Sequence, residues 1–221
     1  AADPAFPDER FVAEVLAPFP SLELKERIAH IAAVLEKYLP GDFPAAADLI
    51  ERALPPPLDP TRTDDDFGRF IFAPFGEYVV SQGLEKHFSR SMRTLEALTQ
   101  RFSMEFAIRP FLNRWPDETL EILAGWTGHP HYHVRRLVSE GTRLRLPWSG
   151  RIAIGADRTL PLLDRLYPDR ARFVTRSVAN HLNDIAKTDP DLAVSTVGRW
   201  MAEGRQAPDE MAWIARHALR T

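Results

Sequence analysis

The sequence predicts an all-α protein, and three observations lead to that fold class. Apolar residues recur at helical spacing in almost every segment, and no segment alternates at the period of two that is typical of strands. The C-terminal half repeats with a period of about forty residues, which is typical of paired helices in HEAT-like repeats. Such repeats stack because one repeat cannot bury its own apolar face. We therefore expect a single domain over residues 1–221, folded as a right-handed solenoid of HEAT-like repeats.

Helices are expected along most of the chain, with a proline-rich break in its first third. The first should cover residues 7–19, and Ser21 should cap a second that carries apolar residues from Leu24 to Leu39. Residues 55–66 are rich in proline and acid and predict a loop, and residues 67–75 predict a short helix or a packed loop. The remaining expected helices cover 45–54, 77–83, 86–101, 104–113, 117–126 and 173–187.

A shift of forty residues superimposes three helices of the C-terminal half, together with the helices and turns before them. The matched sets are Val134 with Val174 and Ile214, Arg136 with Arg176 and Arg216, Val138 with Val178 and Ala218, and Thr119 with Thr159. Chance could align three arginines, but the apolar and turn positions share the same register. Equivalent positions of stacked repeats lie side by side. We therefore expect the three arginines to form a row on one concave surface, with Glu140 and Asn180 in the next turn.

The segment from Phe173 to Lys187 has one apolar stripe and one polar face. The stripe contains Val174, Val178, His181, Leu182 and Ile185, and the polar face contains Arg176, Asn180, Asn183, Asp184 and Lys187. Asn and Asp are poor helix formers, so three of them near the middle of a helix weaken it. The polar face is either a solvated surface with i,i+4 pairs or a surface that contacts a ligand.

Composition is that of an ordinary soluble globular protein, with 44% hydrophobic and 27% charged residues and a net charge of −3. Charge is distributed unevenly. Residues 1–66 carry 6 Lys and Arg against 14 Asp and Glu, and residues 135–187 carry 11 against 5. An acidic N-terminal helical cap over 1–66 and repeats over 103–221 that carry an anion-binding site fit this pattern.

Several classes of function are excluded or disfavoured by the sequence. With no cysteine, the chain has no disulfide, thiolate zinc site or cysteine nucleophile, which fits a reducing compartment. No apolar run is long enough to span a membrane, and residues 1–10 do not read as a secretory signal. The three histidines of His129–His133 lie in a turn without an acidic ligand at metal spacing, so we expect neither a metal nor a cofactor.

The arginine row is a natural surface for phosphate, which raises DNA or RNA as a partner, with acidic peptides as an alternative. Three acids lie in or just before this basic half: Glu105, Glu140 and Asp184. Spacing alone favours ordinary ion pairs, with Arg109 for Glu105 and with Arg136 or Arg143 for Glu140. For Asp184 it favours a pair with Lys187 or capping of a neighbouring helix. Carboxylates directed at a polyanion weaken its binding, so convergence in a phosphate-binding groove would indicate catalysis.

Four ordered motifs resemble the AlkC-type HEAT-like-repeat DNA glycosylases, which are relatives of AlkD. The motifs are MEFAIRPF at 104–111, VRRLVSEG at 134–141, RLPW at 145–148 and SVANHLNDIAK at 177–187. The likeness extends to 24–28 and 216–220, so it covers nearly the whole chain. Some members carry a further immunoglobulin-like domain at the C-terminus. This chain stops at Thr221, so it resembles the subtype without that domain.

The resemblance implies excision of N3-alkylated bases, chiefly 3-methyladenine and also 3-methylcytosine, by hydrolysis of the N-glycosidic bond. It implies Glu105, Glu140 and Asp184 as the active-site carboxylates and Trp148 as an aromatic that stacks near the lesion. The DNA-binding residues would be Arg136, Arg143, Arg145, Arg176, Asn180, Asn183, Lys187 and Arg216. We expect a cytoplasmic monomer that acts on double-stranded DNA at the nucleoid, and the alternative is a non-catalytic HEAT-repeat protein that binds damaged or branched DNA.

Overall fold

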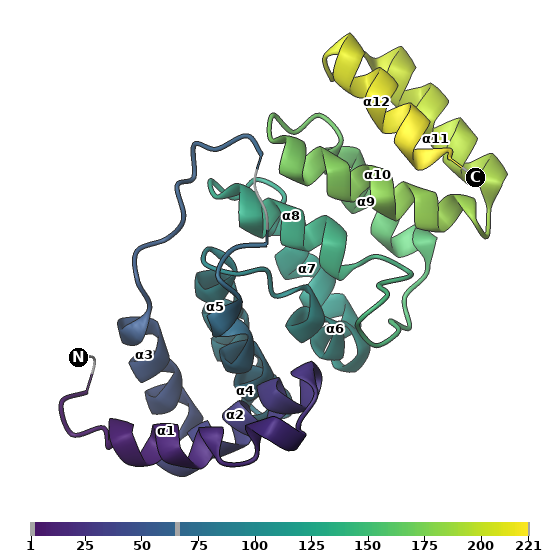
Figure 1. Ribbon diagram of the computed structural model, residues 1–221. Helices are drawn as coiled ribbons and strands as arrows, with labels where there is room; N and C mark the ends of the chain where they lie inside the picture. Colours follow the sequence, from purple (N-terminus) through teal and green to yellow (C-terminus); the bar gives the residue numbers. More distant parts are fainter. Residues whose placement is uncertain (1–2, 65–66, 221) are drawn as a thin grey trace. The chain divides into compact units, whose positions relative to one another are not determined.

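The computed structural model describes residues 3–64 and 67–220, and its regular structure is helical (Figure 1). The α-helices are α1 (Asp8–Leu16), α2 (Leu24–Tyr38), α3 (Phe43–Ala53), α4 (Ala73–Gly83), α5 (Phe88–Thr99), α6 (Glu105–Arg114), α7 (Pro116–Trp126), α8 (Tyr132–Gly141), α9 (Ala156–Leu166), α10 (Arg172–Ala186), α11 (Pro190–Glu203) and α12 (Pro208–Ala218). These described residues form no β-strand. Their one β-type pairing is an isolated bridge between Gly68 and Phe102. The all-α class predicted from the sequence is confirmed.

The chain divides into two compact units. The first contains residues 1–58 and 68–107, and the second contains residues 59–67 and 108–221. The expected loop at 55–66 is present as far as Asp64, while Asp65 and Asp66 lie outside the described residues. The segment 67–75 contains a 3-10 turn, η2 (Phe70–Phe72), followed directly by the start of α4. That residues 1–221 form a single domain stays a prediction.

In the first unit, α2 packs against α1 and α4, and α5 packs against α3 and α4. The expectation that Ser21 caps α2 was wrong. Ser21 ends a 3-10 turn, η1 (Phe19–Ser21), and its hydroxyl donates to the Pro18 carbonyl at 2.8 Å. The cap is Glu23, whose backbone N–H donates to the Glu26 carboxylate at 2.8 Å in a capping box.

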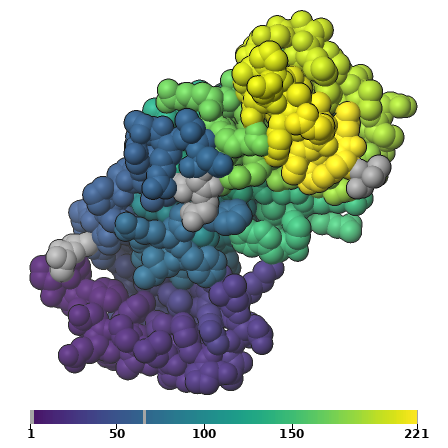
Figure 2. Space-filling view, turned by 45° about the horizontal axis from the view of Figure 1, so that its top comes forward, coloured from purple at the N-terminus to yellow at the C-terminus, as the bar shows by residue number. Residues whose placement is uncertain are grey.

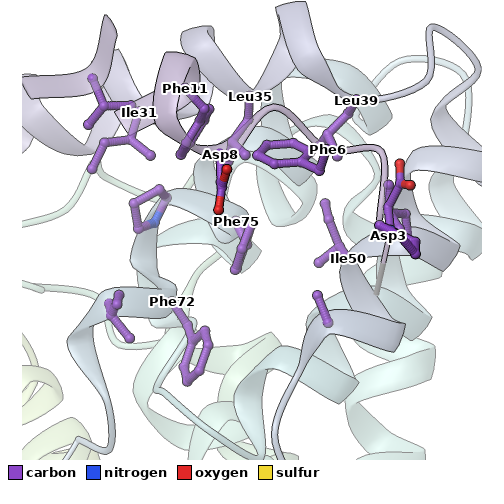
Figure 3. A pocket seen from close by; sticks show the side chains of 16 residues that line it. Asp3, Phe6, Asp8, Phe11, Ile31, Leu35, Leu39, Ile50, Phe72 and Phe75 are labelled. Carbon is purple, nitrogen blue, oxygen red and sulfur yellow. The ribbon is translucent and has the colours of Figure 1, made fainter. Parts of the chain in front are cut away.

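An apolar pocket of about 660 Å³ lies in the first unit (Figure 3). The rings of Phe6, Phe11, Phe72 and Phe75 line it together with aliphatic side chains of α2 and α3. Its charged lining residues are two acids, both in the N-terminal segment that Figure 3 shows crossing the pocket. The lining contains none of the residues that the sequence predicts for chemistry, so this pocket is not the candidate site.

In the second unit, successive helices form antiparallel pairs that stack on one another. Helix α7 packs on α8, α9 on α10, and α11 on α12. The second helices of the pairs form one layer, because α8 packs on α10 and α10 packs on α12 (Figure 1). This stack of paired helices is the arrangement that the forty-residue period predicted.

The matched apolar positions are all in the core of this stack. Val134, Val174 and Ile214 are fully buried, and so are their partners one turn later, Val138, Val178 and Ala218. Thr119 and Thr159 are also fully buried, at equivalent places in α7 and α9. The register read from the sequence is therefore the register of the repeats.

Helix α10 is covered on more than one side, because it packs on α8, α9, α11 and α12. Its apolar stripe is buried as expected. A fully solvated polar face was the wrong interpretation, since Asn183 and Asp184 are buried as well. The Asn183 amide donates to the carbonyls of Ala218 and Arg220, both at 2.9 Å, and so closes the C-terminal end of α12.

Candidate active site

The polar centre of the second unit is a guanidinium held between two carboxylates. Arg143 follows the end of α8, and its Nη1 donates to Glu140 Oε1 at 2.8 Å. Its Nε donates to Asp184 Oδ2 on α10, also at 2.8 Å. Glu140 is only 5% exposed and Asp184 only 2%. Two acids from neighbouring repeats thus meet at one arginine.

Both oxygens of the Glu140 carboxylate accept hydrogen bonds. Its Oε2 accepts a hydrogen bond from Ser177 Oγ at 2.6 Å and lies 3.6 Å from Arg136 Nη2. Burial alone would raise the pKa of Glu140, but the charges of Arg136 and Arg143 and the bond from Ser177 outweigh it, and the pKa is lowered. The carboxyl group is therefore ionised at neutral pH although it is buried.

Asp184 has a second cation nearby, since Lys187 Nζ lies 3.6 Å from its Oδ1. The two expected ion pairs, Glu140 with Arg136 or Arg143 and Asp184 with Lys187, are thus both present. Burial alone would lower the pKa of Arg143, but its bonds to Asp184 and Glu140 raise it. Glu140 and Arg143 are therefore oppositely charged at neutral pH.

A neutral imidazole lies beside this cluster. His181 is fully buried, its Nδ1 is 3.1 Å from the Ser139 carbonyl, and its Nε2 is 3.4 Å from Thr159 Oγ1. Burial lowers the pKa of His181 to about 4, with Asp184 opposing the shift. From the sequence alone His181 looked like one more member of an apolar stripe, so its polar partners were missed.

Glu105 occupies the first turn of α6 and is buried. It accepts a hydrogen bond from the Ser103 hydroxyl. Glu105 belongs to the first compact unit, and the pairing of Glu140 and Asp184 through Arg143 is a property of the second unit. A catalytic role for Glu105 stays a prediction.

The three matched arginines differ in accessibility. Arg136 is 4% exposed and its guanidinium carbon lies 4.5 Å from the Phe173 ring centroid. Arg176 lies 5.7 Å from the same centroid and pairs with Asp64 at 2.6 Å. Arg216 is exposed on α12, the last helix of the stack, yellow in Figure 2. Arg216 is therefore exposed and Arg176 is half-exposed with its guanidinium paired to Asp64, whereas Arg136 is a buried partner of Glu140.

The other residues nominated for DNA contact also divide by exposure. Arg145 and Lys187 are exposed. Asn180 is half-buried, and its Oδ1 lies 2.8 Å from His217 Nε2 and accepts from Arg220 Nη2 at 3.1 Å. The Asn183 side chain is buried and donates to backbone carbonyls at the end of α12. The cations Arg145 and Lys187 are thus exposed, whereas the acids Glu140 and Asp184 are buried.

Trp148 lies in the loop that connects α8 to α9 and is 40% exposed. This loop also carries Arg143 and Arg145. An indole with this exposure, a few residues from Glu140 along the chain, can offer a face to a base.

The histidines of 129–133 contribute to the start of α8. His131 is its N-cap, and its Nδ1 accepts from the His133 N–H at 3.2 Å. The His131 N–H in turn donates to His129 Nδ1 at 3.0 Å. In residues 3–64 and 67–220, no group of three or more His, Cys, Asp or Glu side chains is arranged to hold a metal ion. None of the helices there is long and apolar enough to cross a membrane.

Comparisons with known proteins agree with the motifs. A solved structure of the alkylpurine DNA glycosylase AlkC from Pseudomonas fluorescens, bound to DNA containing an abasic site analog, has a TM-score of 0.84 and 36% identity. The match covers 99% of this chain and 58% of that chain. YhaZ of Bacillus subtilis, an uncharacterized protein, is 36% identical over 222 residues, which is 99% of this chain and 58% of that protein. This chain thus spans little more than half of these relatives, and no family model matches it.

Proposed function

We propose that the chain is an AlkC-type alkylpurine DNA glycosylase, on the basis of its similarity to AlkC over 99% of its length, and that it removes cationic N3-alkylated bases from DNA. The substrates would be 3-methyladenine first and 3-methylcytosine second, and the product would be an abasic site. The observation that carries the proposal is the pair of buried carboxylates, Glu140 and Asp184, held by Arg143.

The chemistry suits such a pair. An N3-alkylated purine already carries positive charge, so it leaves as a neutral base when it takes the electron pair of the C1′–N bond. The sugar then develops oxocarbenium character, and fixed negative charge stabilises it without reorganisation. Water adds to C1′, and one carboxylate of the pair orients that water and accepts its proton. Normal bases are neutral and leave slowly, so the reaction itself selects damage.

Trp148 would lie against the lesion. An indole face attracts a cationic base more strongly than a neutral one, and its exposure leaves it accessible. Glu105 would supply a third carboxylate, as its place in the matched motif implies.

The exposed cations would bind phosphates of double-stranded DNA. We assign this role to Arg145, Arg176, Lys187 and Arg216, which are exposed or half-exposed, and to the half-buried Asn180. Such contacts position the duplex without reading its sequence. Arg136, Arg143 and Asn183 would act from beneath this surface by holding the acids and the helix ends. We propose a monomer that works in the cytoplasm on nucleoid DNA.

One alternative is a HEAT-repeat protein that binds damaged DNA without chemistry. The complete internal pairing of Glu140 favours it, because a fully paired carboxylate can be structural. Incubation with methylated duplex DNA separates the two. Release of free 3-methyladenine above the spontaneous rate, with an abasic strand that is not nicked, supports the glycosylase. Binding without release supports the alternative.

A further inference from the structure

Arg109, in the middle of α6, is 1% exposed, and its guanidinium donates to three backbone carbonyls. Its Nε donates to the Gly150 carbonyl at 2.6 Å. Its Nη1 donates to the carbonyls of Gly141 at 3.0 Å and Arg143 at 2.8 Å. Two acceptors lie where the chain leaves α8, and the third, Gly150, lies further along the loop that leads to α9.

Asn113, one turn further along α6, continues the same attachment. Its Nδ2 donates to the Arg151 carbonyl at 2.9 Å, and its Oδ1 accepts from the Ala153 N–H at 2.9 Å. Residues i and i+4 of a helix share a face. One face of α6 therefore holds the loop 142–153 at several points along its length.

Close packing of α6 against the end of α8 allows the Arg109 side chain to contact the loop. A Cβ atom on Gly141 would lie 2.5 Å from Ile108 Cγ2, so only glycine at the end of α8 permits this approach of α6. Arg109 follows Ile108 directly. Its guanidinium thus arrives at the C-terminal end of α8, where the last carbonyls have no helical partner and carry the negative end of the helix dipole.

The chemistry of the donor matters here. Burial lowers the pKa of Arg109 to about 10, helped by the charge of Arg143, so the group is still protonated at neutral pH. A planar guanidinium can direct its Nε and Nη1 donors to opposite ends of a loop, whereas a lysine ammonium is a single compact donor. Lysine could keep the charge but not both attachments.

We propose that Arg109 is a positioning residue that closes the loop 142–153 and thereby sets the places of Arg143 and Trp148. This inference rests on the proposed function only in assigning a catalytic consequence. The link to the site is direct at one end, because Arg109 donates to the carbonyl of the same Arg143 whose side chain joins Glu140 and Asp184. At the other end it fixes Gly150, two residues beyond Trp148.

The test uses Arg109→Lys in the full chain labelled with 5-fluorotryptophan. The chain has 5 Trp, and Trp148→Phe identifies the fluorine signal of Trp148. We expect that signal to shift or broaden in Arg109→Lys while the other four stay in place. We also expect trypsin to cut after Arg145 and Arg151 at least about tenfold faster, because the loop opens locally at a smaller cost.

Kinetics provide the functional measurement. The rate constant for base release at saturating protein should fall at least about tenfold, since small misplacements of reacting groups are costly. The affinity for abasic-site DNA should change less than about threefold, because the exposed cations remain.

Two further variants serve as controls. Arg114→Lys makes the same chemical change on the same helix, where Arg114 is exposed and stacks 4.1 Å from the Trp115 ring centroid. This control can move the Trp115 signal, but it should leave the Trp148 signal, the cleavage of the loop and the release of base as in wild type. Asn113→Ala removes the attachment at 151–153 from an exposed position, so it keeps the proposal testable if Arg109→Lys does not fold. Asn113→Ala should change the Trp148 fluorine signal and the trypsin cleavage rate in the same direction as Arg109→Lys, but by a smaller amount.

An unchanged Trp148 signal together with unchanged cleavage in folded Arg109→Lys, or in Asn113→Ala if Arg109→Lys does not fold, would overturn the proposal. Equal perturbation of all five tryptophans would also overturn it, because it would indicate a general packing role. If the wild-type protein releases no base, the glycosylase assignment fails, and the fluorine and cleavage measurements still decide whether Arg109 holds the loop.

Discussion

Arg143 donates from its Nε to Asp184 at 2.8 Å, across 41 residues of sequence, which is about one repeat of the stack. Other side-chain bonds at this separation join the same layers. Ser177 reaches Glu140 across 37 residues, and His181 reaches the Ser139 carbonyl across 42. The repeat therefore does more than bury apolar faces: it brings polar residues of neighbouring repeats into one cluster.

The first prediction concerns Trp148. Trp148→Ala should weaken binding of DNA that carries a cationic base by about 1 to 3 kcal/mol, since one aromatic face that stacks on a base contributes about that much. Stability should change by less than about 0.5 kcal/mol because the side chain is partly exposed. Titration with lesion-containing and undamaged duplexes, beside thermal unfolding, measures both. Equal losses for the two duplexes would exclude a contact to the lesion.

The second prediction concerns the exposed cations. If Arg145 and Arg216 contact phosphates, each change to Ala should reduce the slope of log affinity against log salt by about 1. Asp64→Asn should tighten DNA binding, because Asp64 pairs with Arg176 at 2.6 Å and its negative charge would oppose a phosphate at the same guanidinium. If the affinity for DNA did not depend on salt concentration, the result would instead favour the interpretation of this protein as a protein-binding scaffold.

The third prediction concerns Glu140. Glu140→Gln leaves Arg143 and Arg136 short of a buried counter-charge and should cost about 3 kcal/mol of unfolding free energy. Because the folded-state pKa of Glu140 is lowered, the wild type has this contribution above the ordinary pKa of 4.5 and loses it as pH falls through the folded value. Denaturant titrations at several pH values test this, with Glu121→Gln on the exposed side of α7 as a control. The same loss in both variants would count against the buried cluster.

The fourth prediction concerns His181. Its pKa is lowered from 6.5 to about 4, so between these values the unfolded state binds the additional proton. Stability should therefore be complete above pH 6.5 and decrease as pH falls towards 4, by about 3 kcal/mol in total. His181→Asn should lose this part of the pH dependence. A wild-type unfolding free energy that stays constant from pH 6.5 to 4.5 would contradict the neutral buried imidazole.

Much of the architecture was readable from the sequence because it depends on local periodicity. The forty-residue register correctly placed Val134, Val174 and Ile214 in the core. The error at Asn183 has a physical cause: a helical wheel shows which residues share a face, but not how many neighbouring helices cover the helix. Asn183 is polar because it closes the end of α12, 35 residues away.

The candidate site divides in the same way. The pairings of Glu140 with Arg143 and of Asp184 with Lys187 follow from spacing within one helix turn and were expected. The bond from Arg143 to Asp184 and the attachment of Arg109 to Gly150 span about forty residues, and nothing in the local pattern marks their partners. The spacing of the sequence predicts Arg109 only as an ion-pair partner of Glu105. Its hydrogen-bond acceptors are backbone carbonyls, which every residue has, so the sequence does not mark them.

The most direct test of the central claim is single-turnover release of 3-methyladenine by wild type and by Asp184→Asn. The substitution keeps the shape of the side chain and removes the negative charge that faces Arg143. We expect the release rate to fall by about 100-fold or more, which is the scale for loss of one preorganised charge at a reacting centre, while abasic-site DNA binds with nearly unchanged affinity. Release at the wild-type rate by folded Asp184→Asn would contradict the claim that this buried carboxylate pair cleaves the glycosidic bond.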